Sequence, residues 1–124
     1  MTPKERYLAT LERKPVDHLA RIPILMQYAA EHIGKNYGQF ASDYRVLAEA
    51  NITCAREFGI DQMNTMSDPY RETQGYGAKI LYHENMCPSC EKHPLEDDED
   101  ITTLPRPDPM QAERMHDRIE AVRL

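Results

Sequence analysis

The chain has 124 residues, of which 40% are hydrophobic and 29% charged, and its formal net charge is -6. This length and composition predict one small globular domain. The acidic balance excludes the usual nucleic-acid binders, since neutralising phosphates needs a basic face. No apolar run approaches the roughly 20 residues that span a bilayer, so no membrane segment is expected.

The first residues and the cysteines predict the cellular compartment of the protein. The opening stretch MTPKERYLATLERK is charged throughout and does not have the pattern of a signal peptide. The chain has three cysteines, an odd number. Together these features predict reduced thiols in a cytoplasmic protein.

In the first third of the chain we expect a helix, a strand and an irregular stretch. Thr2, Pro3 and Glu5 form a helix start, and the helix should end at Lys14-Pro15. The short apolar run 21–28, RIPILMQY, predicts a buried strand at 22–27. Glycines break the pattern of residues 31–40, which are expected to be irregular.

The middle of the chain predicts the best-defined helix. It should begin at Ser42 or Asp43, run through Phe58 and end at Gly59. Cys54 lies on its apolar face and is expected to be a buried, inert thiol. A second strand at 60–65 follows at once, and this order implies a parallel pair.

The last part of the chain is expected to be rich in loops. Residues 67–77 predict a turn with a helical turn, residues 78–84 a third strand, and residues 86–94 a loop. The acidic run 96–100 is expected to be solvated. A last helix should begin at Asp108-Pro109, with Met115, Ile119 and Val122 on one face.

These elements predict an α/β fold that is incomplete by itself. Parallel strands are normally covered on both faces, and two such units leave one face of the sheet open. We therefore expect the chain to be the N-terminal piece of a larger domain, or to complete itself by association, for example as a homo-oligomer.

The stretch HENMCPSCEKH, residues 83–93, contains four candidate metal ligands: His83, Cys87, Cys90 and His93. A C-x2-C pair suits zinc, because both sulfurs can point inward around one tight turn. However, zinc fingers usually separate their cysteine pair from their histidine pair by about a dozen residues. A closed zinc site, a redox-active pair and a surface loop with two free thiols therefore remain as alternatives.

The order of motifs along the chain points to a known family. The segments ERYLATLERKPVDHLARIPILM, EFGIDQMNTMSDPYRETQGYGAKILYHE, HPLEDDEDITTLPRPDP and RIEAVRL follow one another. This series resembles the N-terminal part of the uroporphyrinogen decarboxylase superfamily, which also holds the cobalamin-dependent methyltransferases. The resemblance implies that residues 1–124 form the first strands and helices of a TIM (β/α)8 barrel, a fold of about 250 residues.

The resemblance also implies where the site lies. Barrel enzymes carry their chemistry at the C-terminal ends of the strands, which here are Met26, Gln27 and Tyr28 after the first strand and Ser67-Asp68 after the second. Asp68 is similar to the aspartate that faces the pyrrole N–H groups of the tetrapyrrole in the decarboxylases, where it stabilises a cationic intermediate. The alternative is that Asp68-Pro69 only forms a turn.

Tyrosines flank this aspartate in the sequence. Tyr70 and Tyr76 could line an apolar cleft beside Asp68, or they could simply be half-buried packing residues. We include Tyr70 with Met26, Gln27 and Tyr28 among the predicted substrate-binding residues.

One stretch departs from the decarboxylase pattern. True decarboxylases carry Met-Arg-Gln-Ala-Gly-Arg after the first strand, and its two arginines bind substrate carboxylates. Here the stretch is MQYAAE, so the arginine positions fall on Gln27 and Glu31. Each lost charge-assisted contact costs about 1.5–3 kcal/mol, which favours the methyltransferase branch.

Three hypotheses follow. The first is an N-terminal fragment of an enzyme that moves methyl groups from a corrinoid partner protein to a thiol, inactive when isolated. For the whole enzyme this implies zinc, held by a His-x-Cys pair and a distant Cys that this stretch does not contain. The second is a uroporphyrinogen decarboxylase acting on a tetrapyrrole substrate, and the third is a small zinc-stabilised binding module.

Overall fold

The computed structural model describes residues 1–96 and 100–124 as a mixed α/β chain built mainly from helices. The predicted acidic run 96–100 includes residues 97–99, which lie outside the described residues. Within the described part, no helix has the length and apolar character that a membrane crossing requires.

The first helix forms where its capping residues predict. α1 spans Pro3–Leu11, so it ends before the predicted Lys14-Pro15, and Arg13 already has a positive φ of 55°. The Thr2 hydroxyl accepts a hydrogen bond from the backbone N–H of Glu5, and the Glu5 carboxylate accepts one from the backbone N–H of Thr2 at 2.8 Å. This reciprocal pair satisfies two backbone donors that the helix itself leaves free, so the local sequence is sufficient to start α1.

The central helix is also confirmed. α4 spans Tyr44–Phe58, the Asp43 side chain caps its start, and Gly59 ends it in the left-handed conformation with φ +61°. Glycine adopts this conformation without the Cβ clash that other residues meet. Cys54 lies in the buried core, as its position in the apolar pattern predicts.

Residues 27–42 differ from the prediction, because they form two short helices instead of a strand end and an irregular stretch. α2 spans Gln27–His32 and α3 spans Tyr37–Ser42. The side chains of Asn36 and Gln39 form a capping box at the start of α3. The prediction gave more weight to the glycines of this stretch than to its capping residues.

The two strands predicted at 22–27 and 60–65 are not formed. Neither segment pairs along its length. One backbone hydrogen bond, from the N–H of Asp61 to the carbonyl of Arg21 at 2.9 Å, joins the start of the second segment to the residue before the first. A strand needs backbone partners along its length. Pro23 has no N–H to contribute, and α2 already begins at residue 27. The two segments therefore lie side by side without forming a ladder.

The strand pairing in the described part of the chain is an antiparallel hairpin. β1 spans Lys79–Leu81, shorter than the predicted 78–84, and β2 spans Ser89–Lys92 within the stretch predicted to be a loop. The register places Ile80 opposite Cys90. The third predicted strand is thus confirmed in its centre, but its partner is the cysteine-containing segment.

The C-terminal part holds three short elements. α5 spans Arg71–Gly75 and is the helical turn predicted there, and a 3-10 turn, η1, spans Ile101–Thr103. α6 spans Glu113–Arg123 and begins later than predicted, because the Asp108 side chain accepts from the backbone of Met110 and closes a separate turn.

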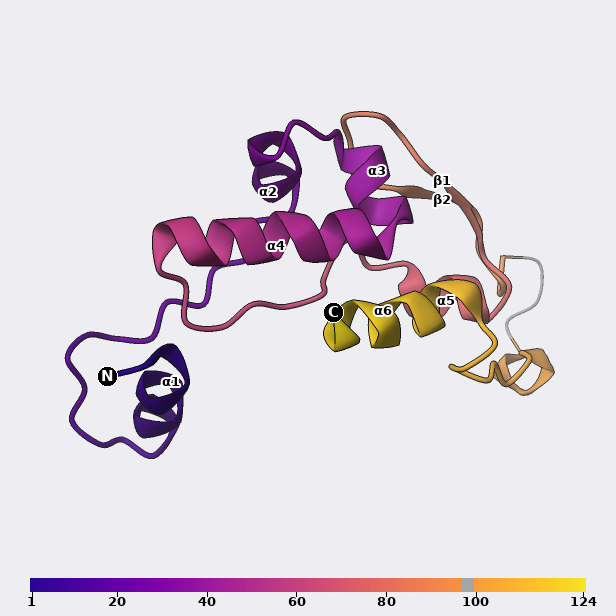
Figure 1. Cartoon of the computed structure of the whole chain (residues 1–124). Helices are drawn as coiled ribbons and strands as arrows, with labels where there is room; N and C mark the ends of the chain where they lie inside the picture. Colours follow the sequence, from indigo (N-terminus) through magenta and orange to yellow (C-terminus); the bar gives the residue numbers. More distant parts are fainter. Residues whose placement is uncertain (97–99) are drawn as a thin grey trace.

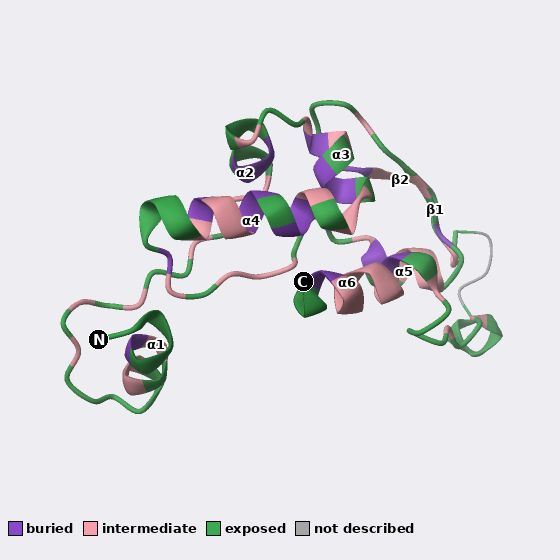
Figure 2. Cartoon of the chain, in the orientation of Figure 1, coloured by how far each residue is buried: buried purple, intermediate pink, exposed green. Residues whose placement is uncertain are grey.

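The elements pack around α4. In Figure 1, α2 and α3 lie on one side of α4, and α5 and α6 lie on the other. α1 lies apart from the other helices, near the C-terminal end of α4. Direct packing joins α4 to α2, α3 and α6, and joins α5 to α6. Figure 2 shows that the buried residues are concentrated along α4 and α3. The core cluster consists of Ala29, Ala30, Tyr37, Phe40, Leu47, Ala50, Cys54, Ile60 and Ala121.

The face that α6 turns to this core is not the predicted one. Arg114 and Ala121 are its buried residues, whereas Val122 is 72% exposed. Met115 and Ile119 are half-buried. The apolar residues at helical spacing were a poor guide here, because an ion pair draws the Arg114 side chain of α6 into the interior.

Candidate functional site

The predicted catalytic residue, Asp68, lies at the end of the extended segment 60–66 that follows α4. Both Ser67 and Asp68 are buried. One carboxylate oxygen of Asp68, Oδ1, accepts from the backbone N–H of Tyr70 at 2.9 Å, and the other, Oδ2, accepts from the Ser67 hydroxyl at 2.6 Å. The bond to Tyr70 is the turn that an Asp-Pro pair favours, and it leads directly into α5.

A buried arginine from α6 completes the surroundings of this carboxylate. Arg114 donates from Nη1 to Asp68 Oδ1 at 3.0 Å and from Nη2 to Asp68 Oδ2 at 2.5 Å. The two side chains are 3% and 0% exposed. The two parallel bonds form a bidentate pair, the strongest geometry for a guanidinium and a carboxylate. Each Asp68 oxygen therefore accepts two hydrogen bonds.

A second buried arginine extends the cluster. Arg71 donates to the Ser67 hydroxyl at 2.9 Å, to the carbonyl of Arg114 at 3.2 Å and to the carbonyl of Ala41 at 3.3 Å. Tyr37 of α3 donates its hydroxyl to the carbonyl of Ser67 at 2.6 Å. The cluster thus joins α3, the end of segment 60–66, α5 and α6 by side-chain hydrogen bonds.

The electrostatics keep this cluster ionised. Burial alone would raise the pKa of Asp68, but hydrogen bonds from Arg114 and Ser67 hold it below its usual value. For Arg114, burial acts to lower the pKa, and the hydrogen bond with Asp68 raises it above the usual value. Burial also raises the pKa of the Tyr37 phenol, which therefore stays protonated. Asp68 is thus a carboxylate at neutral pH, not a proton donor.

The structure brings only one of the predicted substrate-binding residues next to Asp68. Tyr70 is half-buried and bonds to it through its backbone. Met26, Gln27 and Tyr28 lie at the start of α2, and no hydrogen bond or ion pair in the described residues joins them to Asp68. Whether these residues bind substrate stays a prediction.

The start of α2 has its own local geometry. Met26 has a positive φ of 41°, an unusual conformation for a residue with a side chain. The Gln27 amide donates to the Glu31 carboxylate at 2.8 Å on the surface. Tyr28 is 52% exposed, and its ring stacks on His32 with 5.8 Å between the centroids.

In the described residues, the four candidate zinc ligands are not gathered into one group. Among the described residues, no group of three or more His, Cys, Asp or Glu side chains could hold a metal ion. The His83 ring is hydrogen-bonded to the Ser89 hydroxyl at 2.8 Å, Cys90 lies in β2, and Cys87 and His93 are exposed. Cys87 lies in the connection before β2, whereas Cys90 is paired with Ile80 in the hairpin, so the two cysteines are in different local structures rather than around one tight turn.

The sequence did not indicate the arginines of the cluster. Arg71 follows Ser67 by one helical turn, so the start of α5 could have suggested that contact. Arg114 lies 46 residues after Asp68. No local pattern links the two, and a single arginine on a helix rich in charge is usually solvated.

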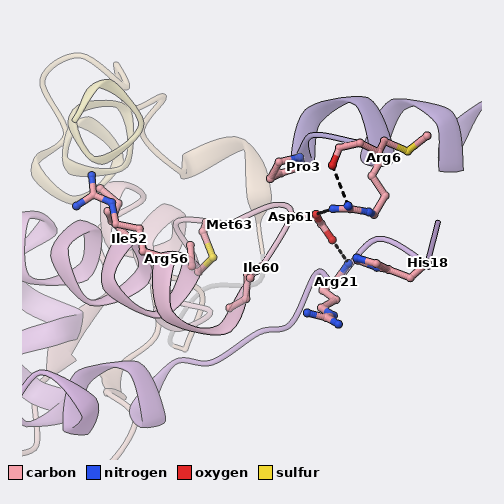
Figure 3. Close-up of a pocket in the computed structure, with 12 residues that line it drawn as sticks. Pro3, Arg6, His18, Arg21, Ile52, Arg56, Ile60, Asp61 and Met63 are labelled. Carbon is pink, nitrogen blue, oxygen red and sulfur yellow. Dashed lines mark hydrogen bonds and ion pairs between the residues drawn. The ribbon is translucent and has the colours of Figure 1, made fainter. Parts of the chain in front are cut away.

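A separate hollow of about 650 Å³ lies at the other end of segment 60–66, beside α1. Figure 3 shows Arg6 directed from α1 toward Asp61, which also accepts from the backbone of Arg21. Arg6 donates to both oxygens of Asp17 as well, at 2.7 and 2.8 Å. These bonds link α1 to the start of the segment, at the opposite end from Asp68, and we assign the hollow no role in catalysis.

Two comparisons with known proteins place this arrangement. Residues 2–124 match the family described as uroporphyrinogen decarboxylase (URO-D). Among solved structures, the chain is similar to a methyltransferase from Methanosarcina mazei, with a TM-score of 0.79 and 20% sequence identity. The match covers 98% of this chain and 37% of that methyltransferase chain. A search of curated proteins returned no match.

The family match extends over nearly the whole chain, and it agrees with the order of motifs in the sequence. The structural match adds that the fold is that of part of a larger chain, of which this chain spans 37%. On these grounds the chain belongs to the uroporphyrinogen decarboxylase family.

Proposed function

We propose that this chain is part of a methyltransferase of the URO-D family, which moves a methyl group from a corrinoid carried by a partner protein to the sulfur of a thiol. In this proposal the corrinoid supplies the methyl group. The similarity in fold to a methyltransferase supports the proposal, and so do two features of the residues themselves.

The first supporting feature is the absence of positive charge at the start of α2. The two positions that carry arginines in decarboxylases are Gln27 and Glu31 here, and these side chains are hydrogen-bonded to each other. A substrate with eight carboxylates needs bidentate cations. Glu31 would repel such a substrate, whereas an uncharged methyl group makes no such demand.

The second supporting feature is the occupied carboxylate of Asp68, and it carries the proposal furthest. Four hydrogen bonds already fill the acceptor positions of its two oxygens. A decarboxylase needs this carboxylate to accept from the pyrrole N–H groups of its substrate. The bidentate pair with Arg114 instead favours a role in holding the loop 67–70 in place.

The proposal also includes the barrel. We propose that segments 22–27 and 60–65 become neighbouring parallel strands of a TIM barrel when the rest of the barrel covers them. The backbone hydrogen bond between Arg21 and Asp61 supports this, because it already aligns the two segments at one end. The described residues contain no group of three or more His, Cys, Asp or Glu side chains that could hold a metal ion, and the proposal assigns no zinc ligand to this chain.

The test is an assay of the product of the complete open reading frame. Purified protein is supplied with methylcobalamin and a small thiol, and separately with uroporphyrinogen. We expect loss of methylcobalamin and formation of the thioether, with no carbon dioxide released from uroporphyrinogen. Decarboxylation without methyl transfer would overturn the proposal and identify the protein as a decarboxylase.

A matched variant separates the roles of Asp68. Asp68→Asn keeps the shape of the side chain but removes its charge. If Asp68 only holds the loop, methyl transfer should fall in parallel with the fraction of folded protein. A loss of activity in protein that remains fully folded would instead show that the carboxylate takes part in the reaction.

A further inference from the structure

A small pocket between α5 and the start of α6 has the features of an anion site. It has a volume of about 210 Å³ and is lined by Gln74, Gly75, Ala112, Glu113 and Arg114. We propose that this pocket binds a small oxyanion, either inorganic phosphate or the phosphate group of an ester. This site is separate from the proposed methyl transfer and does not depend on it.

The start of α6 supplies free backbone donors. The residue before the helix is Ala112, and no side chain caps the helix. The hydrogen bonds of the helix begin with the backbone N–H of His116, which donates to the carbonyl of Ala112 at 2.9 Å. The N–H groups of residues 113–115 have no backbone acceptor among the described residues. Such N–H groups, together with the helix dipole, favour an anion.

Two side chains at the pocket have buried polar atoms without a partner. Arg114 is 3% exposed, and its Nε–H donates to nothing among the described residues. The amide oxygen of Gln74 is also buried without a partner. The oxygen and nitrogen of a glutamine amide are exchangeable by a half-turn, so Gln74 can present its NH₂ group. Both residues line the pocket, so each has a donor without a partner at its wall.

The net charge of the buried cluster also favours binding of an anion. Asp68, Arg71 and Arg114 are all buried, and two guanidiniums with one carboxylate leave one positive charge in excess. Within residues 1–96 and 100–124, Arg71 donates to neutral oxygen atoms alone. The carboxylate of Asp117 attracts both guanidiniums electrostatically, but in the described residues it forms no ion pair with either. A buried positive charge without a full partner is costly, and a bound anion would offset that cost.

The size of the pocket selects the class of ligand. Pockets for whole organic ligands usually measure about 300–1,000 Å³, and this one is smaller. It suits a single ion or one charged group. Glu113 lines the same pocket, and its exposed carboxylate would repel an anion. Removing the charge of Glu113 should therefore strengthen binding.

The experiment is a calorimetric titration of the purified protein with inorganic phosphate and, separately, with methyl phosphate, at constant ionic strength set with chloride. Gln74→Met should weaken binding by about tenfold, the value of one hydrogen bond to a charged group. This change removes an unpartnered polar group, so the protein should remain folded. Gln62→Met, at an exposed glutamine outside the pocket, is the matched control and should bind as the wild type does.

The second variant tests whether binding becomes tighter when the charge of Glu113 is removed. Glu113→Gln should tighten phosphate binding by about threefold, because it removes a repelling charge at a few ångströms in a watery setting. Binding of inorganic phosphate alone would identify a free ion as the ligand, and equal or tighter binding of methyl phosphate would identify an ester. The proposal is overturned if neither compound binds saturably, if Gln74→Met binds like Gln62→Met, or if Glu113→Gln binds more weakly.

Discussion

The buried pair of Asp68 and Arg114 makes a quantitative prediction about stability. We consider Arg114→Met, which keeps much of the length of the side chain and removes its charge. The variant loses two bonds to Asp68 and one to the carbonyl of Ala41. Asp68 keeps its bonds from Ser67 and from the backbone of Tyr70, but its charge is left buried with no cation in direct contact.

The magnitude follows from two limits. Breaking a buried ion pair by removing one partner costs about 3–5 kcal/mol. The upper limit is set by protonation, because the carboxyl group can escape its charge by taking up a proton. At pH 7 that costs an ordinary aspartate about 4 kcal/mol, from a pKa near 3.9 and about 1.36 kcal/mol per pH unit. We therefore expect Arg114→Met to lower the free energy of unfolding by about 3–4 kcal/mol.

The assay is urea unfolding followed by circular dichroism. With a dependence on urea of about 1–3 kcal/mol per molar, the midpoint should fall by about 2 M. Arg118→Met is the matched control, since Arg118 lies on the same helix and pairs with Glu72 at 2.5 Å on the surface. A surface pair is worth about 0–1 kcal/mol. If Arg114→Met proves no more destabilising than Arg118→Met, the inference that the Asp68 pair is desolvated is wrong.

Three further predictions concern acid stability, a close packing contact and a buried amide. Because the folded pKa of Asp68 is lowered from the unfolded value of about 3.9, its contribution to stability should be complete above about pH 4. It should be lost as the pH falls through the folded pKa, so acid unfolding curves of wild type and Asp68→Asn should converge at low pH. Gly38→Ala should cost about 1–3 kcal/mol in urea unfolding, because the new Cβ would lie 2.5 Å from the carbonyl oxygen of His83. Asn51→Ala should cost about 1–3 kcal/mol in the same assay, since the amide donates to the carbonyls of Leu47 and Asn64.

Each of these three predictions has a clear contrary result. Curves that stay parallel down to low pH would show that Asp68 has an ordinary pKa in the folded state. A Gly38→Ala protein as stable as the wild type would show that β1 and its loop move away from α3 at little cost. For Asn51→Ala, unchanged stability would mean that segment 60–66 does not depend on its hydrogen bond to α4.

Two helices with local boundary residues, α1 at its start and α4 at both ends, were predicted from the sequence. Thr2 and Glu5 cap α1, and Asp43 and Gly59 bound α4, all within a few residues of the helices they define. The order of motifs was enough to identify the family, which the family match then confirmed. Each of these inferences depends on neighbours in the sequence or on the order of segments along the chain.

The strands could not be predicted in the same way. The apolar segments 22–27 and 60–65 have the composition of buried strands, but a ladder also needs a partner at each edge. Near them the described residues provide one backbone–backbone hydrogen bond, from Asp61 to Arg21. Conversely, the segment around Cys90 had the appearance of a metal-binding loop, and it became a strand because β1 lies beside it.

The sequence by itself determined the start of α1, both ends of α4, the position of Cys54 in the core and the family. Only the tertiary structure decided that Asp68 is held by Arg114, 46 residues away, and that Arg71 lies buried beside them. The physical reason is that a cap or a turn is closed by bonds between near neighbours in the chain. The partner of a buried charge is instead chosen by packing, which brings together residues that no local pattern connects.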